Sequence, residues 1–315
     1  MTGRLRVLSH LGDADASGIP HELRSRVEVV SVPTRGPVPP EVEGEVLLCV
    51  PWAGDTVDEL LERGVRWVHV CGTGIDELPL RRLAPGLTLT NSRGASAVPV
   101  AEWTLAMMLA FEKRLPESWI DRPPRRWRHD PGLGTLEGRM LALVGLGGIG
   151  TATARRALAF GMRVRALRRT ERPAPEPGVE LAADLSDLVG DADHLVLAAP
   201  LTPATERLID AAALSSVKPG VHLVNVARGR LVDHDALRAA LDDGRVACAS
   251  LDAVDPEPLP AGHWLYAHPR VRLSPHISWG APGALPAILG AFVDNLRRYL
   301  DGLALESVVD PVAGY

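Results

Sequence analysis

The sequence predicts an α/β protein of two domains, each built on a parallel sheet covered by helices. The chain has 315 residues, which is long for a single hydrophobic core. Short apolar runs alternate with helical stretches twice, once before residue 100 and again from residue 141. An apolar helix and a segment rich in proline and glycine lie between the two series, so we expect the domain boundary there.

Five apolar runs bounded by Gly, Pro or Asp predict the strands of the first domain. In chain order they are RLRVLS, SRVEVVSV, EVLLCV, RWVHVC and LTLTN. Runs of this kind, interleaved with helical stretches, are typical of a parallel sheet that is buried on both faces. We therefore expect residues 1–100 to form one such sheet.

The segment between the two series contains a helix and a loop. Residues 100–114, VAEWTLAMMLAFEKR, are apolar nearly all round, so this helix must be buried on several sides, either in an interdomain core or in a dimer seam. Residues 118–137 carry Trp119 and Trp127 among arginines, a combination that can bind single-stranded nucleic acid. Because the net charge is −5, we instead expect a connecting loop whose tryptophans pack on the body.

Six further runs predict the strands of the second domain. They are MLALVGLG, MRVRALR, ADHLVLAAP, VHLVNVA, VACASLDA and VRLSPH. Six strands of this kind suit a doubly wound, Rossmann-type nucleotide domain. A final helix, roughly 283–301, is long enough to return to the first domain. The predicted domains are therefore residues 1–100 with 283–315, and a dinucleotide-binding domain over 101–282.

Composition excludes several classes of partner. The acidic balance argues against nucleic acid and anionic lipid. No run of about 18 apolar residues predicts a membrane span, and the N-terminal stretch is a first strand rather than a signal peptide. Cys49, Cys71 and Cys248 lack the spacing of a disulfide framework or a zinc site, so we expect no metal and a cytoplasmic protein.

Gly145, Gly147 and Gly150 form a G-x-G-x-x-G turn between the strand MLALV and the helix TATARRALAF. The first glycine permits the tight turn, the second lets the backbone approach a pyrophosphate, and the third lets helix pack on strand. The helix N-terminus offers free N–H groups to the phosphates. We therefore predict dinucleotide binding by this turn, including Gly148 and Ile149.

The next strand, MRVRALRR, ends where the adenosine ribose of a bound dinucleotide is expected. An acidic residue there would bind the ribose hydroxyls and repel a 2′-phosphate, but the chain has Arg168, Arg169 and Thr170. Guanidinium groups pair bidentately with phosphate. Unless these arginines merely face solvent, the site prefers NADPH, with NAD as the alternative cofactor.

Arg228, Glu257 and His276 are candidates for proton transfer. Each alone has a structural explanation: an ion pair, an exposed acid and a core histidine. However, each lies at or just beyond the carboxyl end of a predicted strand, where α/β sheets bind ligands. Together they suit reduction of a 2-oxo acid. Arg228 would bind the substrate's carboxylate or carbonyl oxygen, and His276 would protonate that oxygen. Glu257 would orient the imidazole and raise its pKa above about 6.5.

Seven longer motifs occur in the order of a known family. They are CGTGIDEL (71–78), NSRGASAVPVAEW (91–103), VGLGGIG (144–150), PLTPATERLID (200–210), NVARGRLVD (225–233), DPEPLP (255–260) and PHISWG (275–280). On these motifs the chain resembles the D-isomer-specific 2-hydroxyacid dehydrogenase family along nearly its whole length. The basic residue at Arg168 makes it most similar to the NADP-using glyoxylate and hydroxypyruvate reductases.

The resemblance implies a fold and site roles. The fold is a Rossmann-type domain inserted into a flavodoxin-like substrate domain that closes over a cleft, usually in a homodimer. The implied catalytic set is Arg228, Glu257 and His276, and backbone amides at Thr73 and Gly74 are implied to hold the substrate carboxylate. Asp252 is implied to lie near the cofactor carboxamide. The other positions implied to line the cofactor are Pro200, Thr205, Val226, Ala227, Arg228 and His276.

The substrate side chain is less constrained. Trp52 matches a position that walls the substrate site in relatives, and Trp279 could do the same, possibly from a partner subunit. Two bulky walls favour glyoxylate or hydroxypyruvate, although an aromatic 2-oxo acid could stack on them. The alternative function is a dinucleotide-sensing, corepressor-like protein on the same scaffold, which would keep both the glycine turn and the Arg–Glu–His set. We see no disordered recruitment tail at either end, which favours the enzyme.

Overall fold

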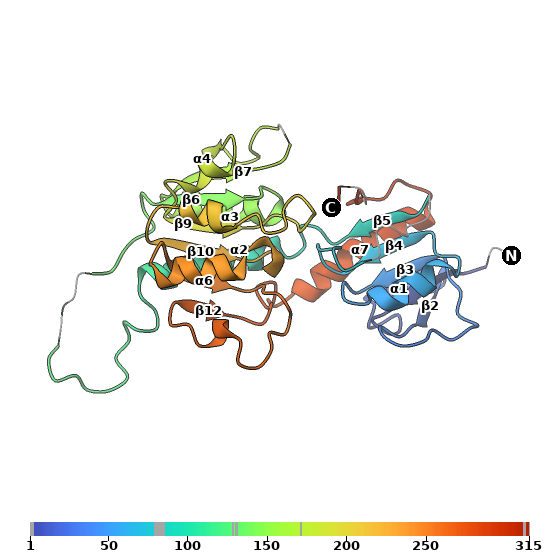
Figure 1. Cartoon of the computed structure of the whole chain (residues 1–315). Coiled ribbons are helices and arrows are strands. Elements are labelled where there is room, and N and C mark those ends of the chain that lie inside the picture. The colour runs from blue at the N-terminus through green and yellow to red at the C-terminus, as the bar shows by residue number, and fades with distance from the viewer. Residues whose placement is uncertain are drawn as a thin grey trace. The chain divides into compact units, whose positions relative to one another are not determined.

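The computed structural model describes residues 3–78, 86–127, 129, 132–170, 172–310 and 313–314. The chain forms two compact units (Figure 1): unit 1 comprises Met1–Ser96 and Ala281–Tyr315, and unit 2 comprises Ala97–Gly280. Each unit contains a parallel sheet with helices on it, which confirms the predicted α/β class. The junctions lie a few residues before the predicted ones. In the described part of the chain, no helix is both long and apolar enough to cross a membrane.

Unit 1 contains a five-stranded parallel sheet in the order β2-β1-β3-β4-β5. Its elements are β1 (Leu5–Ser9), η1 (His21–Leu23), β2 (Val27–Ser31), β3 (Val46–Cys49), α1 (Gly54–Leu61), β4 (Trp67–Val70), β5 (Thr88–Asn91) and α7 (Ala284–Leu300). Every predicted run contains one of these strands. The order is that of flavodoxin-like sheets. All residues of β3 and β4 are buried, as the unbroken apolar runs predict.

The long helix α7 completes the core of unit 1, although its residues come from the other end of the chain. It begins after Gly283, which has a left-handed φ of 82°. Trp67 of β4 stacks on two of its rings, with ring centroids 5.6 Å from Phe292 and 5.1 Å from Tyr299. The predicted closing helix is therefore confirmed, and it covers strands that precede it by more than 200 residues.

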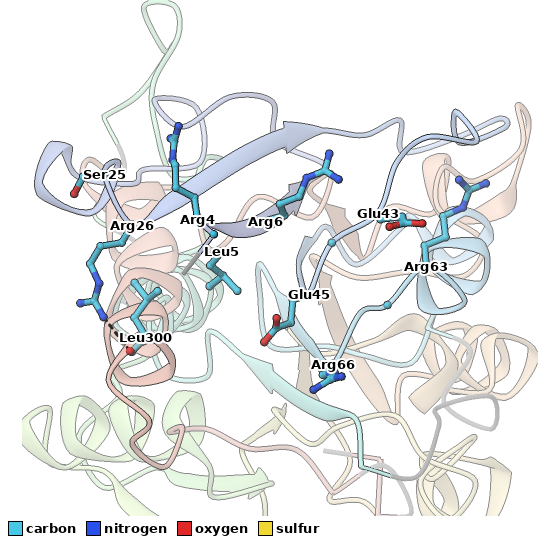
Figure 2. A pocket seen from close by; sticks show the side chains of 13 residues that line it. Arg4, Leu5, Arg6, Ser25, Arg26, Glu43, Glu45, Arg63, Arg66 and Leu300 are labelled. Atoms are coloured by element: carbon cyan, nitrogen blue, oxygen red, sulfur yellow. Dashed lines mark hydrogen bonds between the residues drawn. The ribbon is translucent and has the colours of Figure 1, made fainter. Parts of the chain in front are cut away.

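A hollow of about 810 Å³ lies at the amino ends of the unit 1 strands (Figure 2). Its charged lining residues are Arg4, Arg6, Arg26, Glu43, Glu45, Arg63 and Arg66. Several arginines are held by their own chain, since Arg4 Nε donates to the Val27 carbonyl (2.9 Å) and Arg26 pairs with Asp301 (3.0 Å). The hollow therefore collects basic groups at the end opposite to the one where parallel α/β sheets bind ligands.

Unit 2 contains a seven-stranded parallel sheet in the order β12-β11-β10-β9-β6-β7-β8. Its strands are β6 (Met140–Val144), β7 (Arg163–Leu167), β8 (Val179–Leu181), β9 (His194–Leu197), β10 (Val221–Asn225), β11 (Val246–Leu251) and β12 (Val271–Leu273). Read from β8 along the sheet, this is the Rossmann order with one additional strand, β12. The six predicted strands are present. The sequence did not predict β8, a three-residue edge strand with two exposed side chains.

Helices cover both faces of the unit 2 sheet (Figure 1). They are α2 (Ala97–Glu112), α3 (Gly148–Ala159), α4 (Leu185–Val189), α5 (Ala211–Ser215), η3 (Gly229–Leu231), α6 (His234–Asp242) and η4 (Trp264–Tyr266). The apolar helix α2 buries side chains along its length, from Ala97 to Glu112. The β-strand runs and the helix over 100–114 are therefore both where the sequence places them.

The loop after α2 departs from the prediction. Trp119 and Trp127 do not pack on the body of the protein, because 70% and 71% of their surfaces are exposed. The chain leaves the body of unit 2 here as a long loop (Figure 1). Since the stretch is rich in proline and arginine and has no apolar periodicity, it offers these rings no hydrophobic face to join. The expectation of packed tryptophans was wrong.

Candidate active site

The glycine turn links β6 to α3 by close backbone contacts. Gly145 has a φ of 99°, and a Cβ there would lie 2.7 Å from the Ala198 carbonyl oxygen. A Cβ at Gly150 would lie 2.1 Å from the Gly145 carbonyl oxygen. Only glycine fits both positions, since heavy atoms do not approach so closely. These two residues set the tight turn and the packing of helix against strand.

The middle glycine has a different environment. A Cβ at Gly147 would meet no atom within 4 Å, so the chain itself leaves this space open. The first helical bond runs from the Thr151 amide to the Gly147 carbonyl (2.9 Å). The amides of Gly148, Ile149 and Gly150 donate to no other residue that the structure describes. Open space beside three free amides at a twelve-residue helix fits a pyrophosphate.

Arg168 and Arg169 follow β7, as the sequence predicts. Arg168 Nη1 donates to the carbonyls of Arg172 (3.3 Å) and Pro173 (3.0 Å), which hold its half-buried guanidinium at the end of the strand. Its Nε atom is buried and has no hydrogen-bond partner among the described residues. Arg169 is exposed and Thr170 is half-buried. A buried donor without a partner is costly, and an anionic group would satisfy it.

The loops after β9 and β10 lie at the same edge of the sheet. Thr205 Oγ1 donates to the Pro200 carbonyl (2.7 Å) and accepts from the Thr202 amide (2.8 Å), so this hydroxyl stabilises its own loop. Val226 and Ala227 are buried at the end of β10. Their side chains belong to the wall of the sheet, and any contact with a cofactor would come from their backbone.

Arg228 and Glu257 are brought together by a close backbone contact. A Cβ at Gly229 would lie 2.0 Å from the Val254 carbonyl carbon, so only glycine lets these two loops touch. Arg228 Nη1 donates to the Ala227 carbonyl (2.8 Å), and its own carbonyl accepts from Asn225 Nδ2 (2.8 Å). The loop that carries Arg228 is thereby held against the loop that leads to Glu257.

His276 and Glu257 form a hydrogen-bonded ion pair. His276 donates from Nδ1 to Glu257 Oε2 (2.8 Å), and the Val254 amide donates to Glu257 Oε1 (3.0 Å). The His276 and Glu257 side chains are 38% and 39% exposed. The acid is therefore oriented by the backbone, the imidazole by the acid, and the imidazole keeps access to solvent.

The pair shifts the titration of both groups. The hydrogen bond to Glu257 raises the pKa of His276 above its ordinary value, although burial acts in the opposite direction. Partial burial pushes the pKa of Glu257 upward, but hydrogen bonds from His276 and from the Val254 amide outweigh it, and this pKa is lowered. The positive charge of Arg228 lowers both pKa values. Arg228, Glu257 and His276 thus interact as one charged group.

Asp252 organises the turn that carries His276. Its carboxylate, of which the residue is only 1% exposed, accepts from Ser274 Oγ (2.5 Å), the Ile277 amide (2.9 Å) and the Ser278 amide (2.9 Å). The Asp252 carbonyl also accepts from the His276 amide (3.0 Å). His276 has a φ of 55°, in the left-handed region that a histidine seldom adopts. These bonds hold it there.

Trp279 extends the same turn. Its indole Nε1 donates to the His276 carbonyl (3.0 Å), and 41% of the residue is exposed. The ring is thus tied to the residue that carries the imidazole. The suggestion that Trp279 acts from a partner subunit stays a prediction.

In unit 1, the predicted substrate residues follow β3 and β4. Gly72 has a φ of 131°, and its Cβ position would lie 3.5 Å from Pro51, so the two loops touch. The next two amides, of Thr73 and Gly74, donate to no other described residue. Asn91 Nδ2 holds the loop by donating to the Thr73 carbonyl (2.8 Å). Trp52 is 61% exposed beside them.

The structure thus brings Arg228, Glu257 and His276 together in unit 2, and Trp52, Thr73 and Gly74 together in unit 1. In unit 2 the set lies on the sheet edge that also carries the glycine turn. Residues 105–278 of this unit match the NAD-binding domain of the D-isomer specific 2-hydroxyacid dehydrogenases. The chain belongs to this family.

Relatives and solved structures agree with this membership. The chain is 33% identical over 223 residues to hydroxypyruvate reductase from Thermotoga maritima, covering 70% of this chain and 71% of the relative. It is 31% identical over 243 residues to D-3-phosphoglycerate dehydrogenase from Bacillus subtilis, covering 76% of this chain but only 46% of that relative. A solved 2-hydroxyacid dehydrogenase from Xanthobacter autotrophicus, in complex with NADPH and MES, superposes with a TM-score of 0.81. It is 26% identical, and the match covers 99% of this chain and 100% of that one.

The dehydrogenase family therefore accounts for the NAD-binding Rossmann sheet and the two-unit fold. Its members are NAD(P)-dependent oxidoreductases, and neither the family match nor these relatives support the corepressor alternative. The hold of Asp252 on the His276 turn is a feature of this dehydrogenase that the sequence did not reveal. The available signal was the pair of serines that flank His276, because short polar side chains near an acid often complete a turn.

Proposed function

We propose that this dehydrogenase reduces small 2-oxo acids, such as glyoxylate or hydroxypyruvate, to D-2-hydroxy acids, with NADPH as the preferred cofactor. The observation that carries the proposal is the His276–Glu257 pair, in which Nδ1 is bonded to the acid at 2.8 Å and the imidazole stays accessible. A charged imidazole held in one orientation at the carboxyl edge of a nucleotide-binding sheet is suited to proton donation.

The proton belongs to His276 Nε2. Because Nδ1 is bonded to Glu257, Nε2–H is the group left to face a substrate oxygen. As negative charge develops on the carbonyl oxygen, His276 donates this proton, and the Arg228 guanidinium stabilises the same oxygen or the neighbouring carboxylate. In the reverse oxidation the neutral imidazole accepts the proton from the hydroxyl. Glu257 acts through His276, by orienting it and stabilising its charged form.

The substrate carboxylate fits the loop after β4. Carboxylates bind well to backbone N–H groups that have no other partner, and Thr73 and Gly74 offer two such amides in sequence. Trp52 beside them would limit the size of the substrate's side chain. This arrangement supports small 2-oxo acids over long ones.

The residues of unit 2 fit a dinucleotide. Gly147 leaves room for the pyrophosphate, the amides of Gly148, Ile149 and Gly150 would bind it, and Arg168 would bind a 2′-phosphate. The buried, unpartnered Nε of Arg168 supports NADPH, as does the NADPH in the Xanthobacter relative. When bound, the nicotinamide supplies the hydride that reduces the carbonyl carbon.

The test is oxidation of NADPH and NADH at 340 nm with a panel of 2-oxo acids. We expect turnover with small members of the panel and a higher kcat/KM with NADPH. In Arg168→Asp the preference should reverse in favour of NADH, since an acid repels the 2′-phosphate. Tight cofactor binding without turnover of any 2-oxo acid would contradict the proposed activity, and unchanged cofactor KM values in the variant would contradict the assignment of Arg168.

We also propose a homodimer in a reducing cytoplasm. Exposed apolar side chains gather on and after α2, including Val98, Trp119, Ile120 and Trp127, and a second copy of the chain would cover them. All three cysteines are free, which fits a reducing compartment. Light scattering after gel filtration should give a dimer that Trp119→Ser with Trp127→Ser dissociates, whereas Leu181→Ser, an exposed apolar residue on β8, leaves it intact.

A further inference from the structure

The loops after β1, β3 and β4 meet around the two free amides of unit 1. The loop after β3 touches that after β4 at Pro51 and Gly72. The start of α1 touches the same loop, since a Cβ at Gly54 would lie 2.6 Å from the Glu77 carbonyl oxygen. His10, directly after β1, joins them through Thr56, with Nε2 and Oγ1 3.2 Å apart. A substrate held by the amides would extend into this group of loops.

These three loops are acidic. Residues 10–18, 50–56 and 71–78 contain no Lys or Arg, and their charged side chains are Asp13, Asp15, Asp55, Asp76 and Glu77. Asp55 and Glu77 are exposed and lie on the two segments that touch at Gly54. A phosphate group carries about two negative charges near pH 7, and such a group here would meet like charges rather than partners.

The N-terminus of α1 is the place in this sheet where a phosphate would ordinarily bind. It follows the carboxyl end of β3, and helix N-termini attract anions through free amides and the helix dipole. Here the first turn holds Asp55, so a carboxylate already occupies the favourable field. The Thr56 amide donates back to the Ala53 carbonyl (3.2 Å), as does its hydroxyl (3.1 Å). The α1 terminus is therefore engaged by its own chain.

His10 does not supply a positive charge. Burial lowers the pKa of its imidazole to about 4, so the ring is neutral at neutral pH. Because Thr56 Oγ1 donates its hydrogen to Ala53, it accepts from His10 Nε2–H. The other ring nitrogen, Nδ1, then carries a lone pair, and it is buried without a partner among the described residues. A lone pair favours a hydroxyl and repels a phosphate oxygen.

The basic residues of unit 1 lie elsewhere. At the carboxyl end of the sheet, Arg35 and Arg93 follow β2 and β5, the two edge strands, whereas the site lies between β3 and β4. Five arginines line the hollow at the amino end (Figure 2). Unit 1 thus separates its charges, with arginines at one end of the sheet and acids around the amides at the other.

We propose that the unit 1 loops select unphosphorylated 2-oxo acids, and that Asp55 at the start of α1 excludes substrates carrying a phosphate on the neighbouring carbon. The proposal rests on the reductase activity proposed above. It separates two chemistries that occur among the relatives, one named a hydroxypyruvate reductase and the other a 3-phosphoglycerate dehydrogenase.

The test compares hydroxypyruvate with 3-phosphohydroxypyruvate, which share a carbon skeleton. With NADPH at pH 7.5 and low salt, we expect kcat/KM to be roughly 100-fold higher for hydroxypyruvate. Equal or better turnover of the phosphorylated acid would overturn the proposal while leaving the reductase activity in place. If neither acid nor any other 2-oxo acid were turned over, the proposed activity itself would fail.

A matched pair of variants tests the role of Asp55. Asp55→Asn removes one negative charge and keeps the shape, so the ratio of kcat/KM for the phosphorylated over the unphosphorylated acid should rise about threefold to tenfold. Glu43→Gln removes the same charge at the hollow on the opposite end of the sheet, and should leave the ratio unchanged. An equal response of both variants, or of neither, would contradict the assignment to Asp55.

Discussion

At the carboxyl end of the unit 2 sheet the exposed groups are charged side chains held by hydrogen bonds, whereas at that of unit 1 they are backbone amides. Glu257 and His276 are oriented by the Val254 amide and by Asp252, while Thr73 and Gly74 are oriented by Asn91 alone. The difference follows from the task each end is suited to. Proton transfer needs a titratable group, but an anion can be bound by N–H groups that every residue carries.

The largest effect is expected at the imidazole. His276→Ala removes the proton donor and should lower kcat by about 10³-fold, with the dissociation constant for NADPH nearly unchanged in a fluorescence titration. His268→Ala removes another acid-paired histidine of unit 2, at 3.3 Å from Asp242, and should keep kcat. Near-normal kcat in the first variant would show that the proton comes from elsewhere, and would end the contrast between the two sheet ends.

The next effect tests whether the side-chain site depends on its buried support. Asp252→Asn places an amide where three donors converge, so the His276 turn should shift and kcat/KM should fall about 100-fold. Thermal unfolding should show a loss of about 1–3 kcal/mol. Ser274→Ala removes only one of the three donors and should cost less by both measures. A stability loss without a rate loss would mean that Asp252 holds the fold but not the imidazole.

A smaller effect concerns pH. The pKa of His276 is raised in the folded protein by Glu257, so the protonated donor persists above the ordinary histidine range, and kcat/KM for reduction falls only as pH rises through this raised pKa. Glu257→Gln should move the fall to lower pH and cost roughly tenfold at pH 8. The stability that the pair contributes is likewise full below the unfolded pKa and lost above the folded one. An unshifted profile would separate Glu257 from the titration.

The smallest effect is expected at the backbone site. Gly72→Ala strains a φ of 131° beside the two amides, and should raise KM for the 2-oxo acid roughly fivefold at unchanged kcat. Gly36→Ala, with a φ of 81° in the loop after β2, introduces similar strain away from the amides and should leave KM as it was. If both variants raised KM equally, the amides would have no special role.

Much of this arrangement could be predicted because it depends on local patterns. Every buried run of β-branched residues became a strand, and G-x-G-x-x-G marked its turn, since both signals lie within a few residues. β8 escaped because two of its three side chains are exposed, so it lacks an apolar run. The role of Asp252 escaped because its donors come from Ser274, Ile277 and Ser278, more than 20 residues later.

The tryptophans after α2 show a further limit. A tryptophan in a soluble protein is usually buried on average, so Trp119 and Trp127 were expected to pack. Nothing in a single aperiodic stretch indicates whether an apolar surface lies within reach of the ring. The same limit applies to the unit 1 amides, because any residue has an N–H and only the fold decides which ones stay unpaired.

The split of unit 1 along the chain has a consequence for synthesis. Trp67 is fully buried, yet the rings that cover it, Phe292 and Tyr299, are translated last. On the ribosome, unit 2 has its whole sequence available while the nascent amino-terminal sheet still lacks one of its covers, and the two regions of the chain must mature in the reverse of their order of emergence.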